Sequence, residues 1–191
     1  MKKPVIALLA ASVGLATLAL ASPALASPSQ GTGLICLTGG TSATCSVDRA
    51  TGTATLDVAS GGFASVYTAS STDSAKTPIG QVAFSFTYTC TGSANCEAGG
   101  SPRWSIPITA DNGGMDGYAF VLWNYCTSTT ATSGTSGTVD ANCGVDYGNS
   151  HYGSWQEFAL ANPTFTIGGG GAFMVADQPF QGTISNFQFS S

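Results

Sequence analysis

QVAFSFTYTC, residues 81–90, is the stretch that best indicates the fold. Its apolar side chains occupy every second position, and small or hydroxyl-bearing side chains occupy most positions between them. A period of two residues is typical of a β-strand that packs one face on a core and leaves the other in water. We therefore expect a strand here whose inward face runs from Val82 to Cys90 and whose outward face carries Ser85 and Thr87.

YAFVLWNYC, residues 118–126, is apolar on both faces instead. Tyr118 and Phe120 share one face of an extended chain, and Val121 and Trp123 share the other. A strand that is apolar throughout is typical of the middle of a sheet whose two faces are both covered. The sequence therefore predicts a central strand here that is covered on both sides.

The rest of the chain favours short strands joined by turns, because glycine, serine and threonine are frequent and charged residues are scarce. Ten segments have the composition and turn boundaries of strands. They are residues 33–38, 53–59, 63–69, 81–90, 103–110, 118–126, 139–147, 164–167, 172–176 and 182–189. The tetraglycine at residues 168–171 predicts a hairpin connection between residues 165–167 and 172–175.

SWQEFALANP, residues 154–163, is the one segment with helical features. Ser154 followed by Glu157 three residues later makes a capping box, and Pro163 ends the run. The apolar contacts are expected from Trp155, Phe158 and Leu160. Ten strand candidates with one short helix predict an all-β fold, an antiparallel β-sandwich of jelly-roll type.

The first 26 residues have the features of a secretory signal: two lysines, an apolar run, and a small-residue end at Ala26. We expect cleavage there and a single secreted, extracellular domain of residues 27–191. A transmembrane anchor is the alternative, but the apolar run is short and Pro23 follows it. Cleavage leaves three basic against ten acidic residues, so we expect no nucleic-acid partner and no membrane insertion.

All six cysteines follow the predicted signal: Cys36, Cys45, Cys90, Cys96, Cys126 and Cys143. An even number in an exported chain predicts a disulfide framework, although the sequence alone allows many pairings. Each successive pair encloses a short segment of turn-forming residues. We therefore predict the pairs Cys36–Cys45, Cys90–Cys96 and Cys126–Cys143. A zinc site is disfavoured, because no Cys-x-x-Cys occurs and the chain has a single histidine.

ADNGGMDG, residues 110–117, joins two strand candidates and is dense in the oxygens and glycines that calcium sites use. The side-chain oxygens there belong to Asp111, Asn112 and Asp116, with Asp140 or Asp146 as more distant ligands. The spacing does not match an EF-hand, since glycine and methionine occupy positions that need oxygen ligands. Two interpretations stay open: a calcium site, or a strand connection whose side chains bond their own backbone. No other cofactor is expected.

The sequence contains no assembled catalytic constellation. A glycosidase needs two carboxylates that face each other across a cleft. Glu157 belongs to the capping box, Glu97 lies beside the Cys90–Cys96 turn, and nothing pairs Asp57 with Asp146. The G-x-S-x-G elbow of many serine hydrolases and the nucleotide-binding fingerprints are missing. We therefore expect a protein that is not an enzyme.

Aromatic side chains crowd the middle and the end of the chain. Flat rings can bind the apolar face of a sugar, but they also fill the cores of β-sandwiches. Trp104 and Trp123 lie in apolar strands and are expected in the core. Tyr147, His151 and Tyr152 lie in a segment rich in glycine, asparagine and serine, so these three are the candidate binding residues.

Three segments resemble small secreted β-rich proteins of actinobacteria. They are PRWSIPITADNGGMDGYAFVLWNYC (residues 102–126), CGVDYGNSHYGSWQEFALANPTFTI (143–167) and FMVADQPFQGTISNFQF (173–189). The resemblance implies a secreted β-rich domain and transfers no catalytic residue. In such proteins the loop after PRWSIP is often richer in aspartate, so the resemblance argues against calcium here.

The functional expectation is a secreted protein without catalytic activity that binds at the cell surface or in the extracellular matrix, with polysaccharide as the expected ligand. One alternative is a carbohydrate-active hydrolase with a hidden carboxylate pair. Another is an extracellular inhibitor or toxin-like protein, which would bind a protein partner through an exposed apolar patch or loop.

Overall fold

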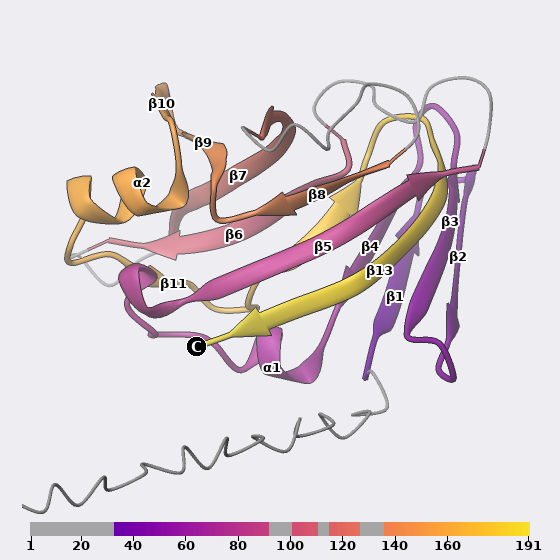
Figure 1. Ribbon diagram of the computed structural model, residues 1–191, viewed down its shortest axis with the longest axis horizontal. Coiled ribbons are helices and arrows are strands. Elements are labelled where there is room, and N and C mark those ends of the chain that lie inside the picture. Colours follow the sequence, from indigo (N-terminus) through magenta and orange to yellow (C-terminus); the bar gives the residue numbers. More distant parts are fainter. Residues whose placement is uncertain (1–32, 92–100, 111–114, 127–135) are drawn as a thin grey trace, which may run out of the picture.

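The computed structural model describes residues 33–91, 101–110, 115–126 and 136–191. These residues form two antiparallel β-sheets that pack face to face, so the predicted antiparallel β-sandwich is confirmed. Figure 1 shows the two sheets as stacked layers, with the main helix at one end of the molecule. The predicted signal, residues 1–26, lies outside the described residues and stays a prediction.

The larger sheet, called the large sheet below, holds eight strands in the described part of the chain. They are β1 (Ile35–Gly39), β4 (Phe63–Tyr67), β6 (Arg103–Thr109), β7 (Met115–Cys126), β9 (Cys143–Tyr147), β10 (Ser150–Tyr152), β11 (Thr166–Ile167) and β12 (Phe173–Ala176). Their order is β1-β4-β12-β6-β7-β9-β10, and β11 pairs with β6. The chain therefore places strands from its beginning and its end side by side.

The other sheet, the small sheet, holds five strands in the described residues. They are β2 (Ala43–Asp48), β3 (Thr53–Val58), β5 (Ala83–Cys90), β8 (Ser136–Asp140) and β13 (Phe180–Ser190). Their order is β2-β3-β13-β5-β8, so the last strand of the chain lies in the middle of this sheet. Strand β5 alternates inward and outward as QVAFSFTYTC predicts, because Phe84, Phe86 and Tyr88 are buried.

Two strands, β2 and β10, were not expected from the sequence, and one predicted strand is divided. The segment 139–147 is not continuous, since β8 belongs to the small sheet and β9 to the large sheet. At the break, the side chain of Asp140 accepts a hydrogen bond from the backbone N–H of Asn142 at 2.8 Å. Such a bond stabilises a tight turn, which here carries the chain from one sheet to the other.

The tetraglycine does not form the predicted hairpin. Strands β11 and β12 do not pair with each other, because both pair with β6, one after the other along its edge. Gly171 has a φ of 68° and passes so close to the backbone at Ser71 that a Cβ would collide there. Ala172 then donates a backbone hydrogen bond to Ser71 O at 3.1 Å. The glycines thus let the chain pass helix α1 (Ala69–Thr72) and rejoin the same sheet.

The core between the sheets is built around Trp104, which is fully buried as predicted. Aromatic rings from β5 and β13 surround it at centroid distances of 4.8 to 5.8 Å: Phe84, Phe86, Phe187 and Phe189. Its indole N–H donates to the backbone oxygen of Val139 at 3.3 Å. Trp123 packs against the core but is only partly buried.

Helix α2 (Trp155–Ala161) begins at the predicted N-cap, where Ser154 accepts from Glu157 N at 3.2 Å. The other half of the predicted capping box differs, because Glu157 Oε2 accepts from Gly153 N at 2.8 Å. Trp155 and Phe158 are buried, but Leu160 is 73% exposed, so the apolar contact predicted for it is wrong. The helix is held by Trp155 Nε1, which donates at 2.8 Å to the oxygen of Ile79 in the short helix η1 (Ile79–Gln81).

Two of the three predicted disulfides are confirmed. Cys36–Cys45 joins β1 to β2 and thereby connects the two sheets. Cys126–Cys143 joins β7 to β9 within the large sheet. Cys90 is also disulfide-bonded, but its predicted partner Cys96 lies outside the described residues.

Candidate binding face

The side of the large sheet that points away from the core carries large apolar side chains from four of its strands, β1, β4, β12 and β7. Alternation along each strand and the pairing registers put them on one surface, which we call the aromatic face. Its apolar members are Ile35, Leu37, Phe63, Tyr67, Tyr118, Phe120, Leu122, Phe173 and Val175. The face thus extends from β1 through β4, β12 and β6 to β7.

Much of this apolar surface is open to solvent. Of the six large hydrophobic side chains that are exposed among the described residues, four belong to the aromatic face. They are Ile35, Leu37, Phe63 and Tyr118, and Leu37 is 54% exposed. Isolated exposed apolar residues are normal on a protein, whereas a large contiguous group is typical of interaction sites.

Strand β7 explains why the sequence did not distinguish this face from a core. It lies in the middle of the large sheet as predicted, and its inner residues Ala119 and Val121 are fully buried. The expected cover on its other side is wrong for the described residues, because Tyr118 is 36% exposed. The Tyr118 ring instead lies 6.2 Å from Phe120 and 6.0 Å from Phe173, measured between centroids. The second apolar side of β7 therefore forms a surface of contacting rings.

One ion pair lies within the aromatic face. The guanidinium of Arg103 donates two hydrogen bonds to the Asp177 carboxylate, at 2.6 and 2.5 Å. The same guanidinium carbon lies 4.9 Å from the centre of the Phe120 ring, a cation–π contact. Because the two charges compensate each other in a bidentate pair, the middle of the face carries no net charge.

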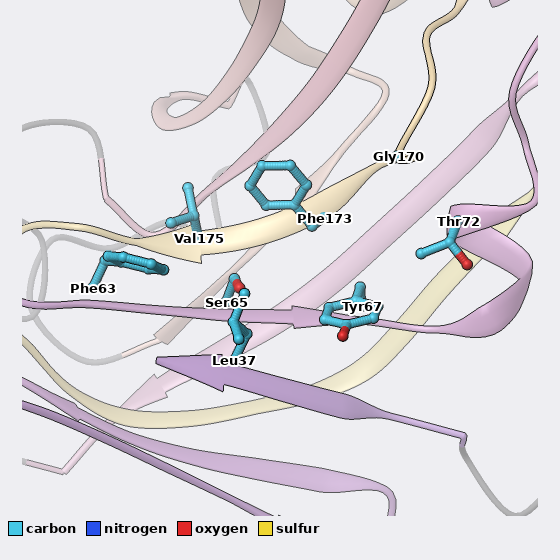
Figure 2. A pocket seen from close by; sticks show the side chains of 8 residues that line it. All are labelled: Leu37, Phe63, Ser65, Tyr67, Thr72, Gly170, Phe173 and Val175. Atoms are coloured by element: carbon cyan, nitrogen blue, oxygen red, sulfur yellow. The ribbon is translucent and has the colours of Figure 1, made fainter. Parts of the chain in front are cut away.

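A groove of about 360 Å³ lies at the β1 end of this face. Its walls come from three strands: Leu37 of β1, Phe63, Ser65 and Tyr67 of β4, and Phe173 and Val175 of β12. Thr72 of α1 and Gly170 also line it. Figure 2 shows Ser65 in the middle of β4, between Phe63 and Tyr67 along the strand. The groove therefore combines flat rings with one short hydroxyl-bearing side chain.

The structure separates the three residues that the sequence proposed for binding. His151 pairs with Asp146 in the β9–β10 register, and Asp146 pairs with Phe120, so the histidine lies at the far edge of the aromatic face. Its Nδ1 is 2.7 Å from Asp146 Oδ1. Tyr147 and Tyr152 point to the other side of the sheet, where both rings contact Phe158 of α2. Strand alternation is the reason for this separation.

The environment of Tyr147 is that of a packing residue. Its ring centroid lies 5.3 Å from that of Phe158 and 5.7 Å from that of Phe165. Burial raises the pKa of the Tyr147 hydroxyl above its ordinary value, and the charge of Asp116 and the neighbouring Tyr152 raise it further. The hydroxyl of Tyr147 therefore stays protonated at neutral pH.

The proposed calcium loop is only partly described, because Asp111 and Asn112 lie outside the described residues. The remaining candidate, Asp116, accepts a hydrogen bond from Ala110 N at 2.7 Å through its Oδ2. This bond joins the two ends of the loop. Within the described residues, no group of three or more histidine, cysteine, aspartate or glutamate side chains could hold a metal ion.

The carboxylates considered for glycoside hydrolysis do not converge where the structure describes them. Asp57 lies on the outward side of β3, in the small sheet, beside Gln181. Asp146 lies on the outward side of β9, in the large sheet. The whole thickness of the sandwich therefore separates the pair, and the geometry offers them no shared cleft.

Comparison with protein-family models, with curated proteins and with solved structures finds no match to this chain. No helix in the described part of the chain is long and apolar enough to span a membrane. The aromatic face is therefore the main structural indication of function in the described residues. The sequence shows that both sides of strand β7 are apolar. It does not show whether the second side is covered by another layer or exposed to solvent.

Proposed function

We propose that this protein is a secreted protein without catalytic activity that binds a polysaccharide on the aromatic face. The observation that carries the proposal is the exposed, contiguous set of rings on an otherwise ordinary sandwich. The disulfides are compatible with an oxidising compartment, which supports the secreted location.

The chemistry of the face matches a neutral sugar polymer. The C–H faces of pyranose rings are apolar and pack on aromatic rings, and Tyr118, Phe120 and Phe173 offer such rings in contact with one another. Sugar hydroxyls need hydrogen-bond partners beside the rings, and the Asp177 carboxylate and the half-exposed His151 provide them on the same face. A face that runs across several neighbouring strands also suits an extended polymer better than a compact ligand.

The experiment is a pull-down of the purified protein on insoluble cellulose, chitin and xylan, with and without a calcium chelator, and with analysis of released sugars. We expect retention without sugar release. The double variant Tyr118→Ala/Phe173→Ala should bind at least about tenfold more weakly, because two stacking rings are lost.

The matched control is Thr87→Ala/Thr183→Ala, which removes side chains from neighbouring strands on the outward side of the small sheet. This control should bind like the unmodified protein and melt at a similar temperature. Release of soluble sugar would contradict the lack of catalytic activity. Absence of retention on every polysaccharide would contradict the proposal and would direct attention to a protein partner for the same apolar face.

A further inference from the structure

The groove at the β1 end of the aromatic face is a hollow made by one small residue among large ones. Ser65 pairs with Leu37 on β1 and with Val175 on β12. Phe63 and Tyr67 lie two residues before and after it on β4, and both line the groove. A short side chain with larger neighbours on four sides leaves space above it, and that space is the groove of about 360 Å³.

The walls of the groove place a limit on the charge of its ligand. None of the residues that line it carries a charge. The nearest guanidinium, that of Arg103 beside Val175, is already held by Asp177. A carboxylate, phosphate or ammonium group would lose its water in this groove without gaining a partner, which is costly. The groove therefore suits an uncharged group.

The hydroxyl of Ser65 places a second limit. Ser65 is only 4% exposed and lines the groove, and among the described residues its side chain has no hydrogen-bond partner. A ligand that fills the groove removes water from this hydroxyl and must replace the lost hydrogen bond. Leaving a buried hydroxyl unsatisfied costs about 1 to 3 kcal/mol. A purely hydrocarbon group, such as an acyl chain, is therefore disfavoured.

We propose that this groove binds the N-acetyl group of an amino sugar, so that the polysaccharide held by the aromatic face is an N-acetylated glycan. The acetyl group is neutral, its methyl can pack against Leu37 and Val175, and its carbonyl oxygen can accept the hydrogen bond of the Ser65 hydroxyl. The volume is near the lower end of ligand pockets, which fits one sugar unit with its substituent. This inference rests on the proposed function and names the ligand class of the same face.

The test compares two oligosaccharides that share a β-1,4-linked backbone and differ in the acetamido group. Binding of chitohexaose and of cellohexaose to the purified protein is measured by isothermal titration calorimetry. We expect chitohexaose to bind about tenfold more tightly, the ratio for one satisfied hydrogen bond with its apolar contact. Ser65→Ala should remove most of this preference, because it should weaken the binding of chitohexaose more than that of cellohexaose.

Two further variants make the result specific. Ser65→Val fills the hollow with a branched side chain that strands accept well, so it should weaken chitohexaose binding more than Ser65→Ala does. Ser85→Ala is the matched control, because it removes a serine hydroxyl from the middle of a strand on the outward side of the small sheet. It should change neither affinity. Melting temperatures of all variants establish that they fold.

The outcomes separate this inference from the proposed function. Equal affinity of the unmodified protein for the two sugars, with no effect of Ser65→Ala, would overturn the N-acetyl site and leave polysaccharide binding standing. An equal loss of both sugars in Ser65→Ala would also overturn it. If neither sugar nor any polysaccharide in the pull-down binds, the proposed function fails and this inference fails with it.

Discussion

The two outward sides of this sandwich differ sharply in chemistry. The outward side of the small sheet carries mostly hydroxyl-bearing side chains and one acidic side chain. They are Thr44, Ser46, Thr55, Asp57, Ser85, Thr87, Thr138, Thr183 and Ser185. Thr87 and Thr138 even contact each other across two strands at 3.3 Å. The outward side of the large sheet, by contrast, carries rings that touch one another.

The difference shows which apolar surface the fold needs and which it does not need. A sheet in a two-layer sandwich needs one apolar side, the side that packs on its partner. The small sheet meets this requirement and is polar elsewhere, so its outward side needs no further explanation. The large sheet has a second apolar side that no fold requirement accounts for, and exposed apolar surface carries a risk of aggregation. The binding role proposed above would account for this exposed apolar surface.

The largest expected effect is a difference in the free energy of unfolding between two alanine variants. One removes a ring from the inner side of β6, and the other removes a ring from the outer side of the neighbouring strand β7. Trp104→Ala removes a fully buried ring from the core, so the free energy of unfolding should fall by about 3 to 5 kcal/mol. Tyr118→Ala removes a partly exposed ring from the aromatic face, and the loss should be only about 1 kcal/mol. Urea unfolding under oxidising conditions measures both values. Similar losses for the two rings would mean that the aromatic face stabilises the fold as a core does.

The fold was predictable because large apolar residues occupy the inward positions of most strands. Strand β5 shows this best, since its alternation of phenylalanine and tyrosine with serine and threonine indicates a strand with one buried face. Strand β2 was missed because its inward residues, Ala43, Cys45 and Val47, are small and carry a weak signal. The tetraglycine was misread because local composition indicates a turn but does not specify which strand the chain pairs with next.

The candidate site was less predictable than the fold. The sequence favoured Tyr147 and Tyr152 as exposed residues on the basis of their polar neighbours, but alternation and the contacts with α2 turn both rings inward. It assigned both sides of β7 to covered positions, because periodicity reports side-chain polarity and not whether a second layer exists. Ser65 carried no signal at all. Its importance comes from its neighbours on β1 and β12, which only the strand register reveals.

A smaller effect should follow from exchanging single residues between the two outward sides. Leu37→Thr makes the edge of the aromatic face polar, and because Leu37 is 54% exposed the free energy of unfolding should change by less than about 0.5 kcal/mol. Self-association at high concentration, measured by sedimentation velocity, should decrease. The reverse change on the small sheet, Thr55→Leu, should not increase it, because one apolar residue among hydroxyls does not make a patch. An increase as large as the decrease would show that single residues, and not the contiguous face, determine association.

The smallest expected effect is a pH dependence of the free energy of unfolding, caused by Tyr147 on the inner side of β9. The pKa of Tyr147 is raised above its ordinary value of 10.0, first by burial, then by the charge of Asp116 and by Tyr152. The folded protein therefore holds this proton more tightly than the unfolded chain, and the stabilisation is complete below pH 10 and is lost as the pH rises beyond it toward the folded-state pKa.

Tyr147→Phe removes the titrating hydroxyl but keeps the ring contacts with Phe158 and Phe165. The free energy of unfolding of this variant should consequently fall less steeply than that of the unmodified protein when urea unfolding is repeated at increasing pH above 10. Parallel curves would mean that the Tyr147 hydroxyl is as well solvated in the folded protein as in the unfolded chain, and that the inner side of the large sheet is open at this end too.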